Sequence, residues 1–340
     1  MNEFSHETSP PPLPQVAENE MSMPQELPAM KLFSAMRKEL RKVFLGQDEV
    51  AGQVLAALLA GGHVLLEGKP GLGKTHLVLA LAKTFGGAFS RIQFTPDLMP
   101  SDVTGFKLFD MKSQTFQLRT GPVFTNLLLA DEINRAPAKT QASLLEVMQE
   151  RQVTIDGESL QIGAPFMTLA TQNPVEHEGT YPLPEAQLDR FIMKIVIDYP
   201  NESDEAAIVA MAAMTQQQDS LATLQVLCTP DDVIAAQKQT AAVVAMPEVV
   251  AYAVALTRAT REARTISLGA GTRGAISLLR IGKALAVMNG RNFVTPDDVK
   301  SAALPVLRHR VQIAPEVAIT GQQVDDILAV IIEGVPAPRM

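Results

Sequence analysis

Residues 68–75 read GKPGLGKT, and this glycine-rich stretch constrains the fold more than any other part of the chain. It follows the apolar run HVLLE and precedes a segment of helical spacing that reaches about Phe85. Glycines let backbone N–H groups curl around an anion, and the start of the helix adds positive potential. The spacing G-x-x-x-x-G-K-T between a strand and a helix therefore predicts a phosphate-binding loop.

The loop assigns roles to its last two residues and requires a partner strand. Lys74 is expected to meet the β- and γ-phosphates of a nucleotide, and Thr75 to place its hydroxyl on Mg²⁺. LLLADEINR, residues 127–135, reads as a buried strand that ends in Asp131 and Glu132. We expect Asp131 to serve the metal and Glu132 to polarise the attacking water as a general base. The alternative is that the two acids only cap the next helix.

Three further polar residues follow in the order that nucleotide chemistry needs. Asn173 ends the strand FMTLATQ, at the same height as Asp131, and could orient the attacking water. Arg190 comes just before a fifth strand, and Arg273 opens a later helix. Arginine stabilises charge on a transferring phosphate. For each arginine an ordinary surface or ion-pairing role stays open, as does a turn role for Asn173.

Strands and helices alternate up to Pro200, which predicts parallel βαβ units in a three-layer α/β domain. Two hairpins interrupt this order, and the second turns at Asp156-Gly157, a type I′ sequence. After Pro200 helix follows helix, and TPDDV starts two of them at Thr229 and Thr295. Gly86 and Gly87 are expected to end the helix after the loop. The expected strands are 63–67, 90–94, 127–131, 166–172 and 191–197, and the expected helices before the loop start near 31 and span about 48–60.

Composition narrows the class of protein. Hydrophobic residues make up 46% and charged residues 19%, as in a folded globular chain. Residues 1–29 carry five glutamates and no lysine or arginine, so this proline-rich segment holds most of the net charge of −8 and reads as a disordered tail. The remaining chain has no basic run, which argues against a nucleic-acid surface. The single Cys228 excludes an intrachain disulfide. No signal peptide or membrane span is expected, which favours a cytoplasmic protein.

The order of these motifs resembles the AAA+ ATPases, and within them the MoxR family of the helix-2-insert group. The resemblance covers about residues 31–337 and is carried by GKPGLGKT, DEINRAP, ATQNPVEHEGTYPLPEAQLDRF, GAGTRG and the late LRHRV. It implies a parallel five-stranded sheet of order 5-1-4-3-2 and a C-terminal, all-helical lid. The implied domains are a tail over 1–29, a nucleotide-binding domain over 30–200 with hairpin inserts at about 103–120 and 152–165, and a lid over 201–340.

The same resemblance gives roles to residues. Asp131 and Glu132 become Walker B, Asn173 sensor 1, and Arg190 an arginine finger that acts on ATP held by the adjacent subunit. Arg273 resembles sensor 2, reaching the γ-phosphate from the lid. The family commonly has Gly-Ala-Ser-Pro before this arginine, whereas this chain has Gly271-Thr272, with the threonine as a possible cap. The implied nucleotide-binding residues are Gly46, Gln47, Gly68, Lys69, Pro70, Gly71, Leu72, Gly73, Lys74 and Thr75.

The implied activity is Mg²⁺-dependent ATP hydrolysis by a homo-oligomeric ring, usually a hexamer. Members of the family typically work with proteins that carry von Willebrand factor A domains, and help mature metalloenzymes or other complexes; some resemble activators that free inhibited Rubisco. We therefore expect a ring that remodels a client protein. The alternatives are a nucleic-acid motor related to helix-2-insert helicases and a nucleotide switch that hardly turns over. The two hairpins are expected to transmit nucleotide state, unless they are structural decoration.

Overall fold

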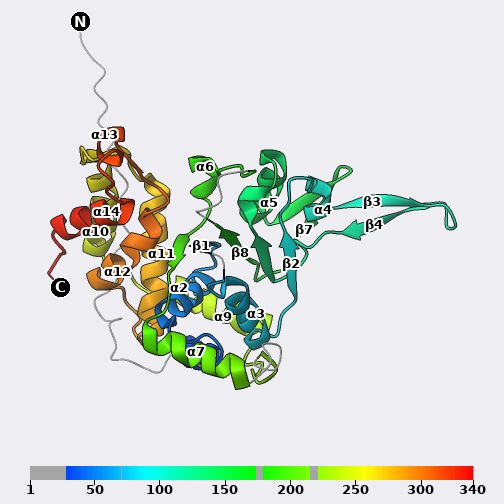
Figure 1. Cartoon of the computed structure of the whole chain (residues 1–340), viewed down its shortest axis with the longest axis horizontal. Coiled ribbons are helices and arrows are strands. Elements are labelled where there is room, and N and C mark those ends of the chain that lie inside the picture. The colour runs from blue at the N-terminus through cyan, green and yellow to red at the C-terminus, as the bar shows by residue number, and fades with distance from the viewer. Residues whose placement is uncertain (1–27, 70, 174–178, 215–220, 340) are drawn as a thin grey trace, which may run out of the picture.

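A twisted parallel sheet forms the centre of the nucleotide-binding part (Figure 1). The computed structural model describes residues 28–69, 71–173, 179–214 and 221–339. The strand order is β2-β5-β8-β1-β9. Numbered 1 to 5 in chain order and counted from β9, the five strands have the order 5-1-4-3-2. The predicted topology is therefore confirmed. The strands are β1 (Val64–Gly68), β2 (Phe89–Gln93), β5 (Leu127–Asp131), β8 (Met167–Gln172) and β9 (Met193–Ile197).

The central strands are buried on both faces, which is why they read as continuous apolar runs. All five residues of β5 are buried. Alternate side chains point to opposite faces of a strand, so Leu127 and Leu129 join one apolar cluster and Leu128 and Ala130 the other. The first cluster includes residues of α2 and α3, the second residues of α5, and this gives the three layers. The helices of this part are α1 (Pro28–Leu40), α2 (Asp48–Leu59), α3 (Lys74–Thr84), α4 (Pro100–Thr104), α5 (Ala138–Glu150) and α6 (Glu185–Leu188), with a short 3-10 turn at Ile133–Arg135.

Two antiparallel hairpins leave the α/β order. The first, β3 (Gly105–Asp110) with β4 (Thr115–Thr120), projects far from the body (Figure 1). The second is β6 (Gln152–Ile155) with β7 (Glu158–Gln161). Asp156 and Gly157 at its turn both have positive φ, as a type I′ turn requires. Lys107 of the first hairpin pairs with Glu158 of the second at 2.9 Å, so the hairpins touch near the base of the longer one.

The C-terminal part is helical, as predicted. Thr229 and Thr295 both cap a helix that begins with proline, and each forms a reciprocal capping box with the aspartate three residues later. None of the helices in the described parts of the chain is long and apolar enough to cross a bilayer. The elements of the C-terminal part are α7 (Glu202–Met214), α9 (Pro230–Ala241), α10 (Pro247–Glu262), β10 (Ile266–Leu268), α11 (Thr272–Met288), α12 (Pro296–Leu307), β11 (Gln312–Ile313), α13 (Pro315–Ala318) and α14 (Val324–Gly334).

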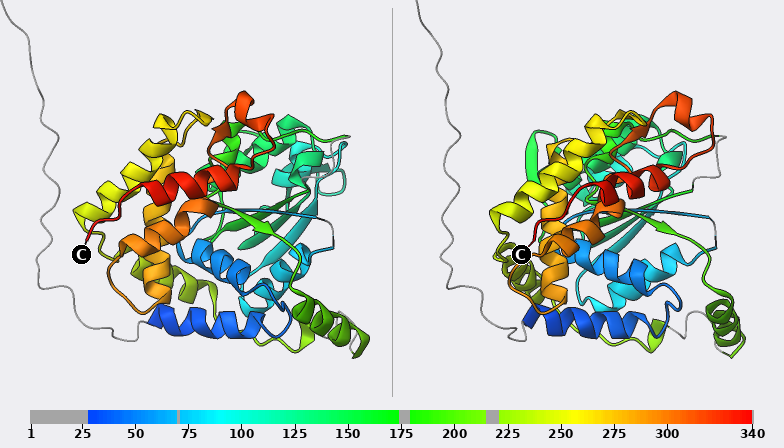
Figure 2. Two further views of the ribbon diagram at one scale, coloured as in Figure 1. Left: turned by 60° about the vertical axis from the view of Figure 1, so that its left-hand side comes forward. Right: turned by 90° about the vertical axis from the view of Figure 1, so that its left-hand side faces the viewer.

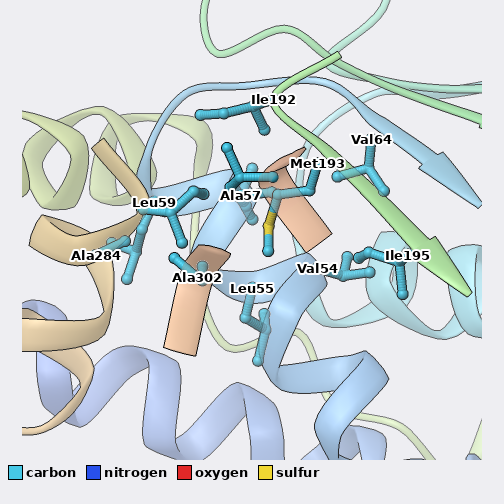
Figure 3. Close-up of a cluster of buried hydrophobic side chains, with 14 of the residues drawn as sticks. Val54, Leu55, Ala57, Leu59, Val64, Ile192, Met193, Ile195, Ala284 and Ala302 are labelled. Atoms are coloured by element: carbon cyan, nitrogen blue, oxygen red, sulfur yellow. The ribbon is translucent and has the colours of Figure 1, made fainter. Parts of the chain in front are cut away.

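The helical lid and the α/β part share one apolar core. Figure 3 shows α2 side chains, among them Val54 and Leu59, beside Met193 of β9 and Ala284 and Ala302 of the lid, and all of these are buried. Figure 2 shows the lid helices stacked against one side of the α/β part. Because burial of apolar surface drives packing, the position of the lid depends on the same cluster that supports β1 and β9.

The helix after the glycine-rich loop does not end in the way that its glycines predict. Helix α3 ends at Thr84 with the extended Phe85 as its C-cap, close to the predicted end, but neither Gly86 nor Gly87 has the positive φ of a glycine cap, so that role for the two glycines is wrong. A Cβ on Gly86 would lie 2.8 Å from the carbonyl oxygen of Cys228, so close backbone approach explains that glycine.

Of the predicted tail, residues 1–27 lie outside the described residues, whereas α1 already begins at Pro28. The domain boundary near 200 stays a prediction.

Candidate functional site

The glycine-rich loop joins β1 to α3 at the carboxyl edge of the sheet. Gly71 and Gly73 have φ of +84° and +75°, a left-handed backbone that L side chains rarely adopt. The ammonium of Lys74 donates to the carbonyl oxygens of Gly68 at 2.5 Å and of Gln172 at 3.4 Å. It therefore lies between the ends of β1 and β8, where a nucleotide phosphate is expected. Pro70 lies outside the described residues.

Asp131 sits beside this loop because β5 ends at the same edge as β1. Its carboxylate accepts the Thr75 hydroxyl at 3.4 Å and the Thr171 hydroxyl at 2.5 Å. It also pairs with the guanidinium of Arg91 on the neighbouring strand β2, at 2.7 Å. Among the described residues no three His, Cys, Asp or Glu side chains form a metal cluster. The Thr75 hydroxyl and the Asp131 carboxylate are oxygen donors of the kind that Mg²⁺ prefers, and these two residues would hold that ion here.

Glu132 has a strained backbone that aims its side chain. Its φ is +56°, a left-handed conformation uncommon for a residue with a Cβ. The Glu132 N–H donates to the hydroxyl of Thr171 at 2.9 Å, which supports this conformation. The carboxylate accepts the amide of Gln93 at 2.7 Å and pairs with Arg135 at 3.2 Å. The carboxylate of the proposed base is therefore oriented by two polar side chains while remaining 31% exposed.

Asn173 meets the other predicted groups at this edge. It is buried and directly follows β8, which lies between β1 and β5 in the sheet. The preceding residue, Gln172, offers its carbonyl to Lys74. Parallel strands bring their carboxyl ends together, so Asn173, Asp131 and Lys74 converge as the sequence predicted.

A polar pocket of about 300 Å³ lies next to the loop and includes Gly46 and Gln47. The side-chain amide of Gln47 donates to the carbonyl of Asp198 at 2.7 Å, which joins this segment to the end of β9. Lys69 of the loop lies 4.9 Å from the ring centroid of Tyr199. No described residue of the glycine-rich loop lines this pocket, but the contact between Lys69 and Tyr199 connects the two, so we expect the base of a nucleotide here. The remaining lining of the pocket comes from Glu49, Val50, Gln53, Val196, Asp198, Tyr199, Pro200, Asn201, Arg308 and Asp325.

The two predicted arginines lie elsewhere. Arg190 precedes β9, so it belongs to the amino edge of the sheet, and its guanidinium donates to the carbonyl of Leu145 at 2.6 Å. Arg273 pairs with Asp189 at 3.6 Å, and both arginines line one pocket of about 270 Å³ that contains no residue of the glycine-rich loop. Gly271 is the N-cap of α11 and Thr272 its first residue, with no side-chain cap, so the predicted threonine cap is wrong.

Sequence reasoning missed the polar residues that surround the acids. Thr171 contacts both Asp131 and Glu132, yet a threonine in an apolar strand reads as an ordinary β-former. Arg91 and Gln93 alternate along β2, which places both side chains on the face toward the acids. That alternation in SRIQF was the available signal, but it could be interpreted only once β2 was known to lie beside β5.

Comparisons with known proteins agree with this geometry. Residues 63–193 match the ATPase family associated with various cellular activities (AAA), and residues 258–331 match the AAA lid domain. The chain is 43% identical to YeaC of Bacillus subtilis (88% of this chain, 93% of the relative) and 42% identical to the chaperone MoxR1 of Mycobacterium tuberculosis (83% and 78%). It is 31% identical to MoxR of Methylorubrum extorquens (88% and 94%).

A solved structure shows the same arrangement. A candidate ATPase from Cytophaga hutchinsonii superimposes with a TM-score of 0.84 at 40% identity, over 92% of this chain and 96% of the other. The identity extends across both the α/β part and the lid. The glycine-rich loop, the paired acids and the polar residue that follows β8 lie at one edge of the sheet. Together with these similarities, this shows that the chain belongs to the MoxR family of AAA+ ATPases and is an ATPase.

Proposed function

We propose that this ATPase works as a homo-oligomeric ring, with ATP and Mg²⁺ bound at each glycine-rich loop, to remodel a client protein. A ring of six subunits and an adaptor with a von Willebrand factor A domain are the expected partners, and the cytoplasm is the expected location. The name of one relative, chaperone MoxR1, supports the remodelling activity.

The main support for a ring is the distance between Lys74 and Arg190 within one chain. Lys74 follows the carboxyl end of β1, whereas Arg190 precedes the amino end of the parallel neighbour β9. A five-residue strand is about 16 Å long at roughly 3.3 Å per residue. Arg190 therefore cannot serve the phosphates on Lys74 of its own chain. A head-to-tail ring solves this, because each subunit presents one edge to the opposite edge of the next.

Within each site the proposed roles follow from the contacts above. Lys74 would neutralise phosphate charge, and Asp131 with Thr75 would hold Mg²⁺, a cation that supplies charge stabilisation during phosphoryl transfer. Glu132 and Asn173 orient and polarise the attacking water. Arg190, and Arg273 beside it, would then stabilise the transition state in the neighbouring subunit. Positioning and charge stabilisation account for most of the catalysis of phosphoryl transfer.

The longer hairpin favours a protein client over a nucleic acid. Phe109 and Phe116 stack edge to face at 5.2 Å near its outer half, and Phe116 is 69% exposed. Met111 at the tip is 82% exposed. The hairpin base uses Lys107 for an internal ion pair with Glu158. Exposed apolar side chains suit contact with a protein surface. The other two cations of the hairpin are Lys112 at the tip and Arg119, whose charge lies near Asp110, so they form no basic track along the hairpin for a nucleic-acid backbone.

The test is ATPase activity of Arg190→Ala mixed one to one with Glu132→Gln, two variants that should each be nearly inactive alone. If sites are completed by neighbours, about a quarter of wild-type activity is expected, the share of sites in a random ring that combine an intact base with an intact neighbouring arginine. Activity no higher than in the two separate preparations would mean that each chain supplies its own arginine. Strong stimulation by single-stranded DNA, with none by an adaptor, would instead favour the nucleic-acid motor.

A further inference from the structure

The segment LRHRV, residues 307–311, has no catalytic role in the function proposed above, yet it connects the lid to the residues just before β9 through several polar contacts. The side chain of Arg310 is only 2% exposed. Its Nε donates to the carboxylate of Asp189 at 2.7 Å, and its terminal nitrogens donate to the carbonyls of Phe191 at 2.7 Å and Ile192 at 3.2 Å. It also donates to the carbonyl of Val306. One buried guanidinium thus ties the end of α12 to residues 189–192.

Residues 189–192 include Arg190, the proposed arginine finger. Asp189, immediately before it, accepts Arg310 and also pairs with Arg273 at 3.6 Å. His309 contacts the carbonyl of Phe191, immediately after it, at 3.0 Å. The backbone on both sides of Arg190 is therefore fastened to the lid. A guanidinium fork bound to a carboxylate and two carbonyls fixes orientation as well as distance.

Arg308, two residues before Arg310, points to the other end of β9. It borders the polar pocket that contains Gly46 and Gln47, and it pairs with Asp325 of α14 at 2.9 Å. Residues 308–310 therefore run from the pocket expected to hold the base of the chain's own nucleotide to the segment that carries Arg190. The guanidinium of Arg190 itself bonds to the carbonyl of Leu145 in α5.

We propose that Arg310 and Asp189 are positioning residues that hold Arg190 in place for the nucleotide site of the adjacent subunit. The proposal rests on the ring described under the proposed function. Neither residue touches a reacting group; each acts through the backbone and side-chain direction of residue 190. A defect in either should therefore appear in the neighbour's site and leave the chain's own site intact.

The first measurement is steady-state ATPase activity of Asp189→Asn and Arg310→Lys. Asn keeps the shape of the aspartate without its charge, and Lys keeps the charge of the arginine without its fork. Each variant should lose about tenfold in kcat while its KM for ATP stays within about twofold, since the lost contact serves the transition state and not nucleotide binding. Wild-type kcat in both variants would overturn the proposal.

The second measurement is complementation, which locates the defect. Glu132→Gln subunits lack the base but keep the arginine, so they can complete the site of a neighbour whose own base is intact. Mixed one to one with Asp189→Asn or Arg310→Lys, they should restore roughly a quarter of wild-type activity, the share of sites that pair both intact halves in a random ring. Activity no higher than the two separate preparations would overturn the proposal.

Two controls separate this outcome from others. Arg190→Ala mixed with Glu132→Gln must show the same restoration; if it does not, the ring proposal itself fails. Asp298→Asn removes a comparable ion pair at the opposite end of α12 from Arg310, in which both oxygens accept Arg291 at 2.6 Å, and weakens the capping box with Thr295 as well. If it lowers kcat as much as Asp189→Asn at a similar loss of melting temperature, lid stability explains the defect and the positioning role is overturned.

Discussion

Lowering the pH from 7 to 5 should destabilise this protein through His63, a buried histidine just before β1. Its Nδ1 accepts the backbone N–H of Thr168 at 2.9 Å, and its Nε2 lies 3.0 Å from the carbonyl oxygen of Met148. Since an N–H can only donate, Nδ1 must be unprotonated and the ring neutral, with its proton on Nε2. Burial is the main cause that lowers the pKa of His63 to about 4.

The size of the effect follows from linkage. An unfolded histidine has a pKa near 6.5, so between about pH 6.5 and pH 4 the unfolded chain binds a proton that the folded chain refuses. Stability is therefore fully present above that window and falls as the pH drops through it. At pH 5 the loss amounts to about 2 kcal/mol relative to pH 7. Burial also lowers the pKa of His309, which adds a loss of the same sign.

Urea unfolding of wild type and His63→Gln at pH 7, 6 and 5 measures the contribution of this one group. Glutamine can donate to Met148 and accept from Thr168 without titrating, and His309 is common to both proteins. The free energy of unfolding of wild type should exceed that of the variant at pH 7, and this advantage should shrink by about 2 kcal/mol at pH 5. Parallel pH profiles, or an NMR midpoint for His63 above pH 6, would refute the reasoning.

Three further predictions concern the site and the hairpins. Lys74→Ala should abolish binding of a fluorescent ATP analogue, and unchanged affinity would contradict the phosphate-loop assignment. Thr171→Val should lower kcat by about tenfold at nearly constant KM, because both Asp131 and Glu132 lose a hydrogen bond; a changed KM alone would contradict this role. Glu158→Lys should leave ATPase activity near wild type and weaken client remodelling, since it breaks only the pair with Lys107; intact remodelling would make the hairpin contact decorative.

The sequence by itself determined most of the candidate catalytic residues at the carboxyl edge of the sheet, because their patterns are local in the chain. The glycine spacing of residues 68–75, the apolar run that ends in Asp131 and Glu132, and the strand that ends at Asn173 each depend on neighbours in the chain. Parallel strands then bring those ends together whatever the remaining sequence does. The capping boxes at Thr229 and Thr295 are equally local, because a helix N-terminus is satisfied within four residues.

Long-range packing decided the rest. Arg91 and Gln93 reach the acids only because β2 pairs with β5, and Arg310 reaches Asp189 across 121 positions of sequence. Gly86 is required by the approach of Cys228, not by the helix it follows. The placement of Arg273 beside Asp189 likewise depends on how the lid packs against the residues that precede β9. Such contacts join residues that no spacing rule relates, so only the tertiary structure could reveal them.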